Sequence, residues 1–146
     1  MKKFAVIAAS TLLLSGCTTT VTLDAAPQAN DPKCAEVIVR LPNIVDGKAE
    51  RVTSAQSTAA WGDPAQIILR CGLPPASSST LPCVTSNGID WLVDSTNAPS
   101  YRFITFGRTP AAEVIMDSRI ASSASVLDEL SSSVSYLPSS RVCTPR

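Results

Sequence analysis

The chain has 146 residues, with 12 basic side chains, 12 acidic side chains and no histidine. This zero balance does not point to the basic face that nucleic-acid-binding proteins need, and the missing imidazole removes the commonest metal ligand. With 45% apolar residues the chain can bury one core. We therefore expect a single domain with no nucleic-acid partner, no cofactor and no metal.

The first 16 residues have the layout of a signal peptide. Lys2 and Lys3 precede an uncharged apolar run over residues 4–14, which as a helix is only about 16 Å long and cannot cross a hydrocarbon core of about 30 Å. The run therefore predicts export rather than a membrane-spanning anchor. Loss of both lysines on cleavage leaves ten basic against twelve acidic residues, a net charge of about −2.

The segment Leu14-Ser15-Gly16-Cys17 resembles the lipobox of bacterial lipoproteins, in which a diacylglycerol is attached to the cysteine thiol before cleavage on its N-terminal side. The resemblance implies palmitate-type acyl chains on Cys17, and at about 0.8 kcal/mol per buried methylene two or three chains hold a protein on a bilayer. A secretory signal with a chance cysteine is the alternative. We expect a lipoprotein anchored to the outer, extracytoplasmic face of the cell membrane.

Residues 18–30 are small and polar, so 17–30 are expected to be a lipidated cysteine with a flexible tether and 31–146 a globular domain. Asp31-Pro32 then has the pattern of a helix start, and this helix would end before Pro42. The β-branched run over 37–39 favours a strand instead. We predict the helix.

Hairpin-linked strands are expected in the middle of the chain. Asn87-Gly88 is a strong turn signal, because both residues tolerate positive φ. Gly62-Asp63-Pro64 forms another turn. The extended candidates are residues 58–61, 65–71, 83–85, 89–93, 101–106 and 112–116, whereas Asp46-Gly47 is read as part of a loop.

The C-terminal helix is the clearest predicted element. Val126, Leu127, Leu130, Val134 and Leu137 recur at helical spacing, and Pro138 follows. Its polar face would hold Asp128, Ser131, Ser132 and Ser135. The predicted fold is α+β: an antiparallel sheet of about five strands with N- and C-terminal helices packed on one face.

Four cysteines remain beside Cys17, an even number that in an exported protein indicates two disulfides with three possible pairings. We expect Cys71 with Cys83, which closes the Pro- and Ser-rich loop of residues 72–82, and Cys34 with Cys143, which joins the two helical ends. Such a loop makes a structural disulfide a better interpretation than a redox-active one.

Four ordered motifs resemble a family of secreted actinobacterial proteins, domain-of-unknown-function family 3515. The resemblance spans about residues 34–143 and implies an actinobacterial envelope, but it brings no activity and no catalytic residue. The motifs are Trp61-Gly62-Asp63-Pro64, Leu69-Arg70-Cys71-Gly72, Gly88-Ile89-Asp90-Trp91 and Thr105-Phe106-Gly107-Arg108-x-Pro110-Ala111-x-Glu113-Val114.

Within these motifs Asp63 and Asp90 each lie near a tryptophan, Trp61 and Trp91, and could pair their carboxylates beside an aromatic platform, as glycosidases and sugar-binding modules do. The alternative is that the indoles fill the core and Asp63 stabilises a turn.

Arg70 and Arg108 could grip an anionic envelope polymer bidentately, or pair internally with Asp90 or Glu113. A serine nucleophile lacks both the G-x-S-x-G elbow and a histidine base. The sequence thus predicts a non-catalytic binding or envelope-support module whose partner is an envelope protein or a cell-wall polymer. The alternative is an envelope-glycan hydrolase that uses Asp63, Asp90 or Glu113.

Overall fold

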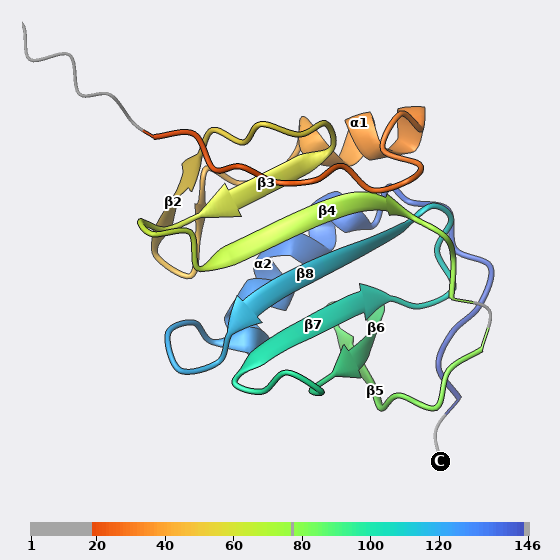
Figure 1. Ribbon diagram of the computed structural model, residues 1–146. Coiled ribbons are helices and arrows are strands. Elements are labelled where there is room, and N and C mark those ends of the chain that lie inside the picture. The colour runs from red at the N-terminus through yellow and green to blue at the C-terminus, as the bar shows by residue number, and fades with distance from the viewer. Residues whose placement is uncertain (1–18, 77, 145–146) are drawn as a thin grey trace, which may run out of the picture.

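The computed structural model describes residues 19–76 and 78–144; Cys17 and the expected signal peptide lie outside them. This part of the chain is built on one antiparallel sheet of eight strands, in the order β1-β2-β3-β4-β8-β7-β6-β5 (Figure 1). The strands are β1 (Ile44–Val45), β2 (Lys48–Arg51), β3 (Thr58–Trp61), β4 (Ile67–Leu73), β5 (Cys83–Ser86), β6 (Ile89–Asp94), β7 (Ser100–Thr105) and β8 (Ala111–Asp117).

The predicted hairpin at Asn87-Gly88 is confirmed, because it joins β5 to β6 with φ of 46° and 78°. Asp46-Gly47 makes the same kind of turn, with φ of 48° and 70°, between β1 and β2. We expected a loop there. Both strands are short, and β2 is polar and half exposed, so the alternation that marks a strand is missing although the turn signal is present.

The helix α1 (Pro32–Ile38) begins at Asp31, whose carboxylate accepts a hydrogen bond of 2.8 Å from the backbone N–H of Lys33. The helix predicted at this position is therefore confirmed over the alternative strand. It ends at Ile38, earlier than expected, where β-branched side chains make further turns unfavourable.

The C-terminal helix α2 (Ser123–Val134) presents Val126, Leu127, Leu130 and Val134 to the core. Ser131 was expected on its outer face, and that is wrong. The side chain is 1% exposed, and its hydroxyl donates to the carbonyl of Ser86 in β5 at 3.0 Å. Both end strands of the sheet, β1 and β5, contact α2, so the sheet curls around this helix.

The predicted architecture of about five strands with two terminal helices on one face is wrong. The sheet has eight strands and is the main regular element of the described domain, whereas the two helices are short, at 7 and 12 residues. The sequence pattern missed β1 and β2, and it could not show that twist would bring the two ends of the sheet to a single helix.

Residues 19–30, expected to be a flexible tether, instead pack along β3 and β4 (Figure 1). The backbone N–H of Gln28 donates to the carbonyl of Gly72 at 2.8 Å, and Ala26 and Ala29 are 5% exposed. Gly72 has φ of 108°, and a Cβ there would lie 2.5 Å from the backbone of residues 28 and 29. A small, polar composition suggested disorder, but these small side chains allow the two backbones to approach closely.

Candidate functional site

The two tryptophans that were considered as binding platforms are both fully buried. Trp61 and Trp91 are 0% exposed and belong to the core cluster. The indole N–H of Trp61 donates to the carbonyl of Pro42 at 3.0 Å, whereas that of Trp91 has no hydrogen-bond partner within the described residues. Neither indole face is therefore open to a ligand.

The carboxylates of Asp63 and Asp90 do not form a pair. Asp63 follows β3, is 84% exposed and forms an ion pair with Arg51 at 2.9 Å. Asp90 lies in β6, where it accepts hydrogen bonds from the hydroxyl of Thr85 at 2.5 Å and the backbone N–H of Cys143 at 2.7 Å. Four strand spacings separate β3 from β6, or about 19 Å, and glycosidase pairs lie within about 9.5 Å.

Glu113 is held between two arginines across three adjacent strands. Its carboxylate, 0% exposed, accepts from Arg70 of β4 at 2.6 Å and also pairs with Arg102 of β7. Burial removes the water that would otherwise solvate this carboxylate, and the two guanidinium groups replace it. Arg70 therefore has a structural role inside the protein, and Arg102 is a partner that the sequence analysis did not identify.

Arg108 has a structural role at the end of α2. Its guanidinium donates to the carbonyl of Ser135, the residue that caps α2, at 3.2 Å, and to the carbonyl of Leu137 in the segment that follows. Burial lowers the pKa of this guanidinium, and the nearby carboxylate of Asp90 offsets only part of that decrease. Of the described residues that were proposed from sequence, Arg108 and Asp90 thus lie near each other, whereas Asp63 lies four strand spacings from the strand of Asp90.

All four cysteines form disulfides, as expected, but the predicted pairing is wrong. The structure joins Cys34 to Cys71 and Cys83 to Cys143, with Cα atoms 5.5 and 6.4 Å apart. Cys71 lies in β4 and Cys83 in β5, with β8, β7 and β6 between them. That spacing is about 19 Å, far beyond the roughly 7 Å that a disulfide can bridge.

One group of side chains has a metal-like arrangement, because the ligand atoms of Cys83, Asp90 and Cys143 lie within 4.8 Å of one another. The two sulfurs are bonded to each other in a disulfide, whereas cysteine sulfur binds a metal as a free thiolate. The disulfide borders a cavity of about 580 Å³ that is also lined by Leu92 and Phe106. In this state the group is a covalent link beside a cavity, not a metal centre.

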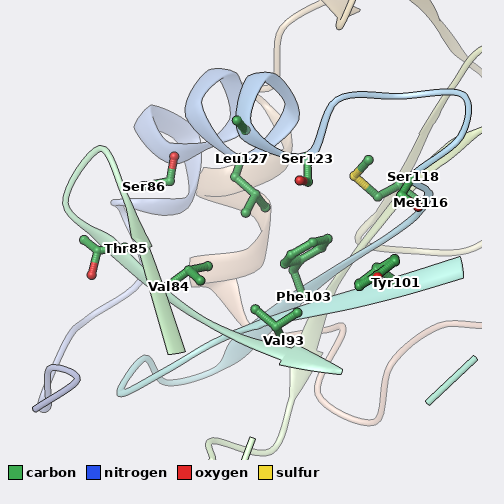
Figure 2. Close-up of a pocket in the computed structure, with 11 residues that line it drawn as sticks. Val84, Thr85, Ser86, Val93, Tyr101, Phe103, Met116, Ser118, Ser123 and Leu127 are labelled. Carbon is green, nitrogen blue, oxygen red and sulfur yellow. The ribbon is translucent and has the colours of Figure 1, made fainter. Parts of the chain in front are cut away.

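A second cavity, of about 500 Å³, lies between the core face of the sheet and the start of α2 (Figure 2). Val84, Val93 and Phe103 point into it from β5, β6 and β7, and Leu127 faces them from α2 (Figure 2). We call this space the β5–α2 pocket. The full lining is Val84, Thr85, Ser86, Val93, Tyr101, Phe103, Met116, Ser118, Ser123, Ala124 and Leu127.

The β5–α2 pocket combines an apolar body with hydroxyl groups. Valine, leucine, methionine and aromatic side chains form its walls, Ser86, Ser118 and Ser123 bring hydroxyls, and no lining residue carries a charge. None of the residues proposed from sequence lines it. The alternation along β7 could have shown that Tyr101 and Phe103 share a face, but not that this face is left partly uncovered.

Within residues 19–76 and 78–144, neither helix has the length and apolar character needed to cross a bilayer. The expected lipid attachment at Cys17 falls outside these residues.

Comparison with known proteins identifies a family. The chain matches the family model described as "Protein of unknown function (DUF3515)" over residues 3–142, so the resemblance read from the four motifs is confirmed at this level. No curated protein and no solved structure matches the chain.

Proposed function

We propose that this chain, which belongs to the DUF3515 family, is an actinobacterial lipoprotein that binds a small uncharged ligand outside the cytoplasm. Lipidation at Cys17 would hold it on the outer face of the membrane. The β5–α2 pocket is the observation that carries the binding role. In this proposal the domain is a non-catalytic binding module.

The size and lining of the pocket define the ligand class. Its volume of about 500 Å³ lies in the range of roughly 300–1,000 Å³ that small-molecule sites occupy, and such sites combine apolar walls with a few polar groups. A charged group would lose its hydration without a charged partner in this lining. The pocket therefore favours an apolar body with one or two groups that bind hydroxyls.

The hydrolase alternative lacks a comparable site. It needs two carboxylates facing a shared cavity. Asp63 pairs with Arg51, Asp90 with Thr85 and the backbone of Cys143, and Glu113 is enclosed by Arg70 and Arg102. Because each of these carboxylates has other partners, the geometry favours binding over hydrolysis.

Export is supported by two features of different origin. The sequence has a charged start, a short apolar run and a lipobox-like segment ending at Cys17. The structure has two disulfides, which persist in oxidising compartments and are rare in the cytosol. Loss of fatty-acid labelling in a Cys17→Ser variant would support the anchor, and continued labelling would refute it.

Binding can be tested with residues 18–146, a fragment that keeps every contact described above. The probe is N-phenyl-1-naphthylamine, an uncharged dye that fluoresces in apolar sites. In Val84→Glu a carboxylate enters the pocket wall at a position that is already 41% exposed. We expect about tenfold weaker binding, equivalent to about 1.4 kcal/mol.

The matched control is Val39→Glu, which changes another exposed valine, at 76%, beyond the end of α1. Its affinity for the dye should equal that of the unchanged protein. Equal binding by Val84→Glu, or no binding by any form, would contradict the proposed site.

A further inference from the structure

The start of the described chain is fixed to the segment that connects β2 to β3. The backbone N–H of Val21 donates to the carbonyl of Val52 at 2.8 Å, and Ser54 returns a hydrogen bond to Val21 at 3.0 Å. Thr19 is held by Arg51, whose Nη2 donates to its carbonyl at 2.7 Å and to its hydroxyl at 2.9 Å. The chain therefore leaves the domain at a defined place.

Arg51 is itself held in position. Its Nη1 donates to the carbonyl of Gly62 at 3.0 Å and pairs with Asp63 at 2.9 Å, and its side chain is 11% exposed. One guanidinium thus connects the first described residue, the end of β2 and the turn after β3. These partners fix the position of the Arg51 side chain, and its hydrogen bonds to Thr19 hold that residue close to the end of β2.

The distance from Thr19 to Cys17 is limited by covalent geometry. Two residues span at most about 7 Å of extended chain. If Cys17 carries lipid, as proposed above, the backbone position to which the lipid is attached lies within that distance of Thr19. A longer tether would leave the domain free to rotate, but residues 19–30 are packed on the sheet and provide no such length.

We infer that the surface formed by Thr19, Thr20, Arg51, Val52 and Asp63, here called the anchor face, lies against the lipid headgroups. Val52 is 64% exposed and apolar, both threonines are exposed, and Arg51 and Asp63 neutralise each other. A neutral surface with hydroxyls and one exposed apolar side chain suits the headgroup region of an uncharged bilayer. This inference rests on the proposed lipid anchor and adds an orientation to it.

The opposite end of the domain then points away from the membrane. Figure 1 shows the start of the described residues and the C-terminal segment at opposite sides of the domain, although the sheet curls so that its two end strands both contact α2. The disulfide between Cys83 and Cys143 and the exposed Val142 lie at that end. The anchor face and Val142 therefore provide two matched positions for measuring orientation.

The test uses the full-length lipidated protein in phosphatidylcholine vesicles. Val52→Cys and Val142→Cys each replace an exposed valine, at 64% and 72%, and the new thiol takes a bimane label because the domain's own four cysteines are in disulfides. Lipids with a nitroxide on the headgroup quench bimane only at short range. We expect loss of fluorescence at position 52 and none at position 142.

Equal quenching at the two positions, in protein that sediments with the vesicles, would overturn the orientation while leaving the lipid anchor intact. Protein that stays in solution would refute the anchor and the orientation together. If Val52→Cys does not fold, Thr20→Cys reports on the same face from the neighbouring segment, and absence of quenching there would equally overturn the inference.

Discussion

The two halves of the sheet are built differently. The first, β1 to β4, has residues 19–30 packed along it, α1 against β4, and the disulfide Cys34–Cys71 at 0% exposure in its core. The second, β5 to β8, borders the β5–α2 pocket, and its disulfide Cys83–Cys143 is partly open to solvent. The first half is consolidated by packing, whereas the second leaves apolar surface available to a ligand.

This contrast suggests that the first half of the sheet serves mainly stability and that the second half provides the proposed binding surface. A ligand site needs surface that the fold itself does not cover, and such surface contributes less to folding. Here the two halves of one continuous sheet are covered to different extents by the rest of the chain. Substitutions in the two halves should therefore lower the free energy of unfolding by different amounts.

The largest difference is expected from the disulfides. In Cys34→Ala/Cys71→Ala, the chain-entropy model gives about 4 kcal/mol for a loop of 37 residues. Removing two fully buried sulfurs adds a cavity cost of about 1 kcal/mol. We expect the free energy of unfolding to fall by about 5 kcal/mol, measured by urea denaturation of residues 18–146 followed by far-UV circular dichroism.

The corresponding loss in Cys83→Ala/Cys143→Ala should be smaller, about 2 kcal/mol. The loop is longer, at 60 residues, so the entropy model alone predicts slightly more than for the first disulfide. However, Cys143 lies near the end of the described chain, and the released segment can fray in the folded state and regain entropy there. An equal or larger loss than in the first variant would show that the two halves do not differ in this way.

The smallest difference in the free energy of unfolding is expected between variants of the two buried indoles, one in each half of the sheet. Trp61→Phe and Trp91→Phe remove similar volume, but only the first also removes a hydrogen bond, from Nε1 to the carbonyl of Pro42. Trp61→Phe should therefore be less stable than Trp91→Phe by about 1 kcal/mol. Equal unfolding midpoints would mean that the indole of Trp91 has a partner of its own in solution.

Local sequence patterns predicted individual elements better than the site. Asn87-Gly88, the cap at Asp31 and the periodicity of α2 are set by near neighbours, and they were interpreted correctly. Asp63, Asp90, Trp61 and Trp91 were grouped because they are chemically suggestive and close in the sequence motifs. The strand order places Asp63 and Asp90 four strands apart, and spacing along the chain does not determine strand order.

The sequence by itself determined the family, the even set of four domain cysteines, the central hairpin and the two helices, because these depend on motif order, composition and local backbone preference. Tertiary structure alone decided the disulfide pairing, the burial of Ser131, the packing of residues 19–30 and the existence of the β5–α2 pocket. Each of these depends on which strands become neighbours and how far the sheet twists. The packing of the whole chain sets those quantities, and no single segment contains them.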